Sequence, residues 1–325
     1  MTAFLLRRLT ASAVLIWLVL TLTFVIAELA PGGPGGLILD SRVPPEHSQR
    51  LLDLYGLDLP LAQRYGSWLR AIVVSGDWGM SFSAKRPVRE LIGLYAPYTL
   101  ALGAAALAVQ FVLGLWLGTA AARRPGSRRD HAIRIVSLVL YSTPAFWLGL
   151  MAILLLSHTI PLFPPGSAGS LSGDASWVAR SADLLRHLAL PALVLGLATL
   201  GAVTRLVRGK LIETLQQDYV RTARAKGVGE RTVVWVHALR NAAAPVVQLA
   251  GLSLPILASG TLVIEQVFSW PGIGRLTWEA IANHDYPVLL ACTGWAALMV
   301  IIGTLVADLL LAVVDPRTRD EGSPA

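Results

Sequence analysis

Six apolar runs, each roughly 20 residues long, constrain this sequence more than any other feature. They lie at about residues 9–30, 98–122, 135–158, 188–207, 243–266 and 288–314. A helix needs roughly 20 apolar residues to cross a hydrocarbon core about 30 Å thick, and helical backbone satisfies its own hydrogen bonds there. The runs therefore predict an all-α integral membrane protein with six transmembrane helices.

The composition agrees with a membrane protein. Of the 325 residues, 54% are hydrophobic and only 14% are charged, against about 45–50% apolar and about 25% charged in soluble domains. Arg7 and Arg8 precede the first run, as in a signal peptide. Its apolar length exceeds that of a signal peptide, however, and no small-x-small cleavage site precedes "PGGPGG". We therefore expect the first run to be a retained anchor.

Basic residues predict the orientation. With a cytoplasmic N-terminus, the short outer loops hold only Arg180, Arg186 and Arg275. The long outer segment, about 31–97, adds seven more basic residues, but segments beyond about 60 residues translocate largely regardless of charge. The inner segments hold Arg7, Arg8, Arg123, Arg124, Arg128, Arg129, Arg134, Arg208, Lys210, Arg221, Arg224, Lys226, Arg231, Arg240, Arg317 and Arg319. Lys and Arg accumulate on the cytoplasmic side of membrane proteins. Both termini are therefore expected in the cytoplasm, and the net charge of +7 needs no nucleic-acid partner.

This topology divides the chain into three parts. Residues 1–30 form the first transmembrane helix, residues 31–97 an extracytoplasmic segment, and residues 98–325 a five-helix core with a cytoplasmic loop at about 208–242. In the outer segment, Leu61, Tyr65, Trp68 and Ile72 recur at helical spacing after Pro60. This pattern predicts an amphipathic helix against the membrane face or neighbouring spans. A surface subdomain with no role of its own is the alternative.

Few charged residues occur in the apolar runs. Glu28, Arg205, Glu265 and Asp308 all lie near a predicted helix end, so we interpret them as interfacial anchors or partners between helices. Ion-coupled carriers usually place such groups deep in the bilayer.

Prolines at positions 144, 191, 245 and 255 lie within or beside the runs and favour kinked helices.

Motifs of known enzymes are missing from the sequence. It has no phosphate-binding G-x-x-x-x-G-K-[ST] loop, no H-E-x-x-H and no G-x-S-x-G. Cys292 is the single cysteine and lies in an apolar run, which excludes an intrachain disulfide and a cysteine metal cluster. We therefore predict no catalytic residue and no metal site, and expect any energy for transport to come from another chain.

The stretch "DYVRTARAKGVGERTVVWVHALRNA", residues 218–242, is basic and favours helix. Asp218 is a suitable N-cap, residues 219–226 are rich in Ala and Arg, and Gly227 fits the left-handed position that ends a helix. Helical spacing then resumes and leads into the fifth run. Small residues would let another protein approach closely. The alternative, a solvated loop beside anionic lipid, explains the charge but not the capped helix and turn together.

This stretch resembles the cytoplasmic coupling loop, or EAA-type motif, of permease subunits in binding-protein-dependent ABC importers of the dipeptide/oligopeptide and nickel branch. The resemblance covers nearly the whole chain. It includes "LLRRL", "GLDLPLAQRYGSWL", "GDWGMSF", "HLALPALVLGL", "TRLVRGKLIETL", "EQVFSWPGIGRL", "DYPVLLA" and "DLLLAVVDPRTR", in that order. The resemblance implies the type I ABC importer permease (MetI-like) fold and a translocation-pathway subunit for peptides in a bacterial or archaeal cytoplasmic membrane.

The resemblance also implies two sites. An ATPase-coupling loop would consist of Asp218, Tyr219, Arg221, Thr222, Ala223, Arg224, Ala225, Lys226, Gly227 and His237. An extracytoplasmic gate loop, a short re-entrant element, would consist of Phe268, Trp270, Pro271, Gly272 and Gly274. A plain tight turn is the alternative for the second site. Arg221 stands where the broader motif has Glu, so a salt bridge through that Glu is not carried over to this chain.

The implied partners are a second permease subunit, two ATP-binding subunits, an extracytoplasmic solute-binding protein and membrane lipid. ATP and magnesium would be bound by the partner ATPases and no cofactor by this chain. Nickel or another small solute is the alternative cargo. An ATP-independent carrier or channel, and a membrane scaffold or exporter component, are the competing classes of protein.

Overall fold

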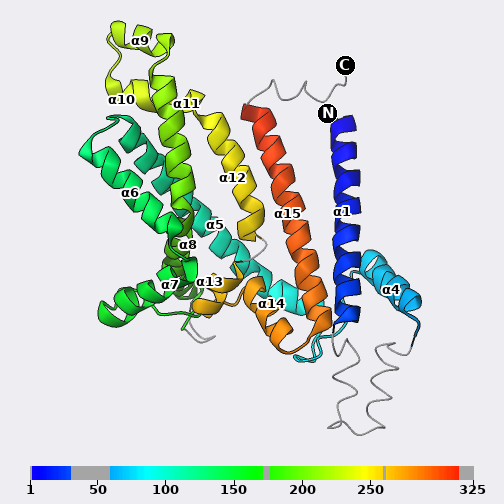
Figure 1. Ribbon diagram of the computed structural model, residues 1–325. Helices are drawn as coiled ribbons and strands as arrows, with labels where there is room; N and C mark the ends of the chain where they lie inside the picture. Colours follow the sequence, from blue (N-terminus) through cyan, green and yellow to red (C-terminus); the bar gives the residue numbers. More distant parts are fainter. Residues whose placement is uncertain (1, 31–58, 171–175, 259–260, 315–325) are drawn as a thin grey trace. The chain divides into compact units, whose positions relative to one another are not determined.

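The computed structural model describes residues 2–30, 59–170, 176–258 and 261–314 (Figure 1). Within these residues the secondary structure is helical, apart from one isolated β-bridge between Met80 and Pro87. The chain divides into two compact units. Unit 1 contains residues 1–98 and 271–299, and unit 2 contains residues 99–270 and 300–325.

Unit 1 is built from the chain's first helices and two later ones. Its elements are α1 (Thr2–Leu29), α4 (Leu61–Arg70), the π-helical turn Ala71–Ser75, the start of α5 (Val88–Ala122), α14 (Ile273–Ala282) and the start of α15 (Tyr286–Val314). Val88, Leu91, Ile273, Val288 and Cys292 belong to its buried core. Segments almost two hundred residues apart therefore form one core.

The amphipathic helix predicted in the outer segment is confirmed as α4, with Pro60 at its N-cap position. Its Tyr65 and Trp68 rings pack on Phe24 of α1, with ring centroids 5.4 and 5.0 Å apart. The Tyr65 hydroxyl also lies 2.6 Å from the Thr21 hydroxyl. The helix therefore lies on a neighbouring span, and residues 31–58 of the outer segment fall outside the described residues.

Unit 2 holds most of the remaining helices. They are the rest of α5 and α15, α6 (Arg128–Ser142), α7 (Ala145–Ile153) with the π-helical turn Leu154–Thr159, α8 (Trp177–Leu215), α9 (Asp218–Ala225), α10 (Glu230–Thr232), the π-helical turn Val233–Ala238, α11 (Leu239–Asn241), α12 (Ala243–Ala258) and α13 (Leu262–Val267). The 39-residue helix α8 contacts α6, α7, α12 and α13. It is the central element of the unit (Figure 1).

Small residues let the helices of unit 2 approach closely. A Cβ added at Gly114 of α5 would lie 2.6 Å from Val203 Cγ1 of α8, and one added at Gly196 of α8 would lie 2.6 Å from Val109 Cγ1 of α5. Membrane helices associate through such packing because lipid supplies no hydrophobic driving force between them. The α5–α8 contact therefore depends on glycine from both sides.

Four helices are long and apolar enough to cross a membrane, in Thr10–Leu29, Val88–Ala122, Trp177–Leu215 and Tyr286–Leu310. A fifth span is present if α6 and α7 count as one, but these two helices are bent by 100°. The continuous helix predicted over residues 135–158 is therefore wrong. Thr143 is extended, with φ −83° and ψ 131°, because the proline that follows, Pro144, disfavours helical backbone at the residue before it.

The predicted span over residues 243–266 is also interrupted. Helix α12 ends at Ala258 and α13 begins at Leu262, while residues 259–260 lie outside the described residues. The apolar part of α12, Ala244–Ser253, is too short to be counted as a span. The described part of the chain thus gives four or five candidate spans rather than six.

Three of the four charged residues predicted as interfacial anchors or partners between helices contact other helices. Glu28 of α1 accepts a hydrogen bond from Arg64 Nη2 of α4 at 2.6 Å. The guanidinium of Arg205 in α8 lies 4.7 Å from the centre of the Tyr141 ring in α6. Buried Glu265 of α13 accepts a hydrogen bond from Thr99 Oγ1 of α5 at 3.0 Å. These contacts satisfy polar groups that lipid could not.

A buried carboxylate ties α15 to the segment before α5 in unit 1. Asp285 Oδ2 accepts hydrogen bonds from Ser81 Oγ at 2.6 Å, Ser83 N at 3.0 Å and Ser83 Oγ at 2.7 Å. Burial raises the pKa of Asp285, but the bonds from Ser81 and Ser83 outweigh it and hold the pKa below the usual 3.8. The carboxylate is therefore ionised at neutral pH.

We expect Asp285→Asn to destabilise unit 1 by roughly 1–3 kcal/mol, because hydrogen bonds to a charged acceptor become bonds to a neutral one. The folded-state pKa is lowered, so the charge stabilises the fold above pH 3.8 and loses this effect as pH falls further. Unfolding in detergent at neutral and acidic pH measures the difference. Glu90→Gln is the control, because Glu90 forms an exposed ion pair with Arg86, and it should change the free energy of unfolding little. Equal losses of stability in the two variants would contradict the expectation.

Candidate functional site

The basic segment that follows α8 forms a helical hairpin, residues 218–241, called here the coupling hairpin. Its first helix, α9, ends at Ala225, and Gly227 two residues later has the predicted left-handed conformation, with a φ of +79°. The Gly227 amide donates to Arg224 O at 2.9 Å and the Val228 amide to Ala223 O at 3.2 Å. These two bonds form a Schellman motif, which needs a left-handed residue at this position.

The start of α9 differs from the prediction by one residue. Gln217 holds the N-cap position without a side-chain cap bond, and Asp218 is the first helical residue. Asp218 instead lies 3.4 Å from Arg221, one turn along the helix. Its charge still interacts favourably with the N-terminal end of the helix dipole.

The coupling hairpin presents its predicted residues to solvent. Ala223 is partly buried, and the others are exposed: Asp218, Tyr219, Arg221, Thr222, Arg224, Ala225, Lys226, Gly227 and His237. Val220 is fully buried, and α9 contacts the π-helical turn Val233–Ala238. One apolar residue thus anchors α9 while the rest of its surface is open to a partner.

Arg224 and Glu230 join the two arms of the coupling hairpin. Arg224 Nε and Nη2 donate to the Glu230 carboxylate at 3.1 and 2.8 Å. The hydrogen bond from Arg224 lowers the pKa of Glu230 below its usual value, although burial opposes it. Glu230 was not among the site residues predicted from the sequence. It could have been found as an acidic residue six positions after Arg224, on the other side of the turn at Gly227.

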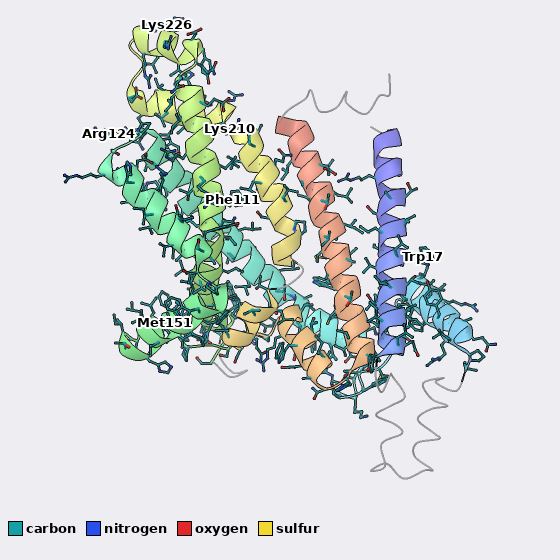
Figure 2. The ribbon with its side chains drawn as sticks, in the orientation of Figure 1. Trp17, Phe111, Arg124, Met151, Lys210 and Lys226 are labelled. Atoms are coloured by element: carbon teal, nitrogen blue, oxygen red, sulfur yellow. The ribbon has the colours of Figure 1, made fainter. Side chains whose placement is uncertain are left out.

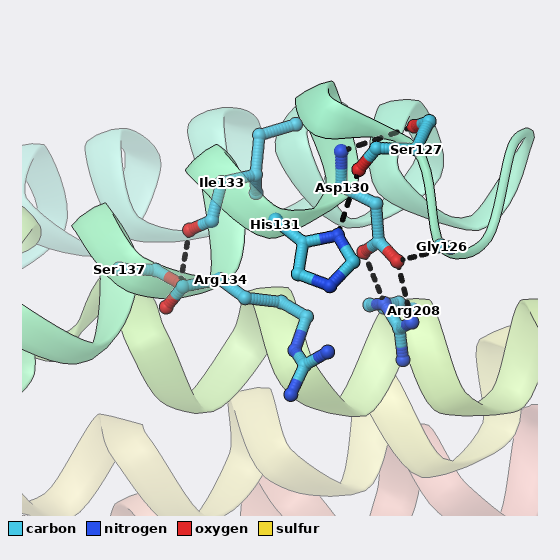
Figure 3. Close-up of polar contacts among 8 residues, drawn as sticks. All are labelled: Gly126, Ser127, Asp130, His131, Ile133, Arg134, Ser137 and Arg208. Atoms are coloured by element: carbon cyan, nitrogen blue, oxygen red, sulfur yellow. Dashed lines mark hydrogen bonds and ion pairs between the residues drawn. The ribbon is translucent and has the colours of Figure 1, made fainter.

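A second ion pair lies at the base of the coupling hairpin, between α6 and α8 (Figure 3). Arg208 Nε and Nη2 donate to the two Asp130 oxygens at 2.6 and 2.8 Å. Asp130 Oδ2 also accepts from the Gly126 amide at 2.9 Å, and the Ser127 hydroxyl caps α6 by accepting from the Asp130 amide at 3.2 Å. Both oxygens of this buried carboxylate are therefore engaged, and the loop after α5 is fixed to α8.

The other predicted site follows α13. Ser269 has a left-handed φ of 50°, its amide donates to Gln266 O at 3.2 Å, and the Trp270 amide donates to Glu265 O at 2.8 Å. This is a Schellman motif with Ser in place of glycine. Helix α13 therefore ends in a tight turn, and α14 begins at Ile273.

Burial separates the predicted gate-loop residues. Phe268 and Trp270 are almost fully buried, Gly272 and Gly274 are buried, and Pro271 is partly buried. The Phe268 carbonyl accepts from the Ser167 amide at 2.9 Å, which fixes it to the loop after α7. The aromatic side chains therefore hold this turn in place, and Ser269 is exposed at its tip.

The coupling hairpin and α13 lie at opposite ends of unit 2 (Figure 1). Side chains follow the same division: Arg124, Lys210 and Lys226 lie towards the end with α9, and Met151 lies at the other end (Figure 2). The described residues contain no group of three or more His, Cys, Asp or Glu that could hold a metal ion. Unit 2 thus has a predicted site at each of its two ends.

Known proteins match the chain along nearly its whole length. Residues 110–320 match the family model "Binding-protein-dependent transport system inner membrane component", and residues 1–103 match "Binding-prot-dependent transport system membrane comp, N-term". These matches and the apolar helices define a multi-pass membrane component of a transport system. The chain belongs to the binding-protein-dependent transport system inner membrane component family.

The relatives are named as peptide permeases. The chain is 38% identical over 318 residues to the oligopeptide transport system permease protein AppB of Bacillus subtilis, covering 98% of this chain and 99% of that protein. It is 36% identical over 337 residues to the dipeptide transport system permease protein DppB of Escherichia coli, covering 98% and 99%. The predicted resemblance to the peptide branch is thereby confirmed.

A solved structure supports the fold. The inward-facing MetNI methionine ABC transporter aligns with a TM-score of 0.56 and 17% identity, covering 70% of this chain and 97% of that chain. At this identity the likeness concerns the fold alone. The MetI-like permease fold predicted from the sequence is therefore confirmed as the fold class.

We expect Arg208→Ala to cost about 3 kcal/mol of stability, because it leaves the buried Asp130 carboxylate without its partner. Lys210→Ala is the matched control two residues along α8: its pair with Glu213 is exposed, and such pairs contribute about 0–1 kcal/mol. Denaturant unfolding of the purified protein in detergent compares them. Equal losses in the two variants would show that the Asp130–Arg208 pair is not stabilising.

Proposed function

We propose that this chain is the translocation-pathway subunit of an ATP-driven ABC importer for peptides. The observation that carries the proposal is the end-to-end similarity to oligopeptide and dipeptide permeases. Import of nickel or another small solute by the same machinery is the alternative cargo, because no polar pocket in the described residues identifies a peptide. The membrane is the cytoplasmic membrane of a prokaryote; the matched relatives named above are bacterial.

The proposed topology has six membrane-crossing segments, α1, α5, α6 with α7, α8, α12 and α15, and both termini in the cytoplasm. It places the basic loops after α5 and α8 inside, in agreement with the positive-inside rule. Residues 31–97 are then extracytoplasmic, and residues 98–325 form the five-helix core with the coupling hairpin inside.

Coupling through α9 is the proposed mechanism. Two partner ATPase subunits bind ATP and magnesium, and the exposed face of α9 docks on one of them. ATP binding shifts an equilibrium between two arrangements only if the partner binds one of them more tightly. The Arg224–Glu230 pair, the Schellman turn and buried Val220 support this mechanism because together they make the coupling hairpin rigid enough to transmit a displacement.

The turn from Phe268 to Gly274 is proposed as the extracytoplasmic gate loop. Its buried aromatic residues, Phe268 and Trp270, suit an element whose side chains hold the backbone in place. A second permease subunit completes the wall of the pathway, and an extracytoplasmic solute-binding protein delivers the cargo. ATP hydrolysis is carried out by the partner chains, and this chain binds no cofactor of its own.

We expect Gly227→Val to leave membrane insertion intact and to lower ATP-dependent uptake of a labelled dipeptide by tenfold or more. No atom lies within 4 Å of an added Cβ at Gly227, so the strain comes from its φ of +79°, and a left-handed conformation costs roughly 1–2 kcal/mol with a side chain. Uptake in membrane vesicles supplied with ATP is the measurement.

Gly209→Val is the matched control, because an added Cβ at Gly209 also meets open space but the backbone there is right-handed helix. Gly227→Asn should retain much of the uptake, since Asn tolerates the left-handed region. Normal uptake by Gly227→Val would refute the proposed role of the hairpin. Uptake driven by an ion gradient without ATP would instead favour an independent carrier.

Cysteine labelling tests the topology. In a Cys292→Ser background, Lys226→Cys should react with a membrane-impermeant maleimide only in inside-out vesicles, and Trp177→Cys only in right-side-out vesicles. Both positions are exposed, so the membrane alone decides access. Labelling of both positions from the same side would contradict the proposed topology.

A further inference from the structure

Unit 1 contains a cavity of about 370 Å³ between α1, α4, the segment before α5 and the start of α15. Five aromatic side chains line it: Phe24, Trp68, Trp78, Phe82 and Tyr286. Its size lies at the lower end of the range for small-molecule sites, about 300–1,000 Å³. Aromatic faces are electron-rich and attract organic cations.

Charged groups in the cavity are arranged asymmetrically. Glu28 and Arg64 pair with each other at 2.6 Å and neutralise one another. Arg64 Nε, by contrast, is buried and has no hydrogen-bond partner among the residues that the structure describes. Asp77 is exposed and accepts only the Gly79 amide, at 2.9 Å, within the described residues. One carboxylate charge is therefore left over, together with one buried donor, and a ligand carrying both a cation and an anionic oxygen complements them.

The cavity lies at the level where a membrane span ends. Phe24, Ala27 and Glu28 line it, and they belong to the last turns of the span Thr10–Leu29. Beside it, Val73 and Val74 on the turn after α4 are 74% exposed. Trp and Tyr rings concentrate at this depth, where lipid headgroups begin. The surroundings therefore supply phospholipid headgroups directly to the cavity.

We propose that this cavity is a binding site for a zwitterionic phospholipid with a primary ammonium headgroup, such as phosphatidylethanolamine. The ammonium lies among the aromatic faces and donates to Asp77. A phosphate oxygen accepts the hydrogen bond from Arg64 Nε, which gives that donor a partner. An anionic lipid such as phosphatidylglycerol has no cation to pair with Asp77. The site goes beyond transport itself and depends on α1 crossing the membrane; in the proposed topology the lipid belongs to the outer leaflet.

Lipid retention by the assembled transporter tests this site. The complex is reconstituted in nanodiscs with equal amounts of phosphatidylethanolamine, phosphatidylcholine and phosphatidylglycerol, re-extracted in mild detergent, and its bound lipids are quantified by mass spectrometry. We expect phosphatidylethanolamine to be enriched about threefold over the other two, because the ammonium of phosphatidylcholine has no N–H to donate to Asp77 and phosphatidylglycerol has no cation. A threefold ratio corresponds to somewhat under 1 kcal/mol. Asp77→Asn and Trp68→Leu should each remove the enrichment.

Glu90→Gln is the matched control, a charge removal in unit 1 at an exposed pair outside the cavity, and should leave the enrichment unchanged. Melting temperatures of the variants show that the fold is kept, and Trp68→Leu tests the site without altering its charge. Three outcomes would each overturn the proposal. They are equal retention of the three lipids, enrichment of phosphatidylglycerol, and displacement of phosphatidylethanolamine by a short zwitterionic peptide. ATP-dependent uptake is scored separately, so loss of uptake with intact lipid enrichment would count only against the proposed function.

Discussion

Hydrocarbon offers no hydrogen-bond partner, so a chain that enters it must pair its own backbone groups, and the rest of this structure follows from that requirement. Helices meet it along their length but leave unpaired carbonyls at their ends. Among the residues that the structure describes, three helices end in Schellman motifs, at Gly227, Ser269 and His284, where the amides of the left-handed residue and its successor donate to those carbonyls. The turns at Gly227 and Ser269 lie within the two candidate sites. The backbone geometry of those sites therefore follows from the C-terminal capping of α9 and α13.

Local pattern predicted local structure well. The amphipathic helix α4 followed from its apolar spacing, and the left-handed Gly227 followed from composition around one turn, because both depend on residues close in sequence. Continuity of the long spans did not follow. Hydropathy measures the free energy of transfer from water, so it does not detect a single extended residue such as Thr143. For the same reason the apolar run over residues 243–266 predicted one helix where the structure has α12 and α13. The Asp130–Arg208 pair joins residues 78 positions apart, and no local pattern could have placed those two charges together.

The coupling hairpin and the gate turn differ in how they are held. The first helix of the hairpin is held by buried Val220 and by polar contacts, and the second arm by buried Val233, Val234 and Ala238, while the predicted residues of α9 other than partly buried Ala223 are exposed. The turn after α13 is held by buried aromatic residues and shows little but Ser269. A surface that binds and releases a partner needs exposed side chains on a backbone whose own hydrogen bonds are satisfied. An element that closes a pathway needs a fixed shape. The sequence distributes charge and aromatic residues in accordance with these two needs.

The 100° bend after α6 limits how far that helix can reach. With 15 residues in α6 and 16 in α12, each is roughly 22–24 Å long at 1.5 Å per residue, short of a hydrocarbon core about 30 Å thick. Helices shorter than the bilayer are accommodated by local thinning of the lipid or by flanking side chains that extend to the interface. Within unit 2 the local thickness of the lipid therefore bears on α6 and α12 more than on the 39-residue α8, and α12 is the helix into which the coupling hairpin leads.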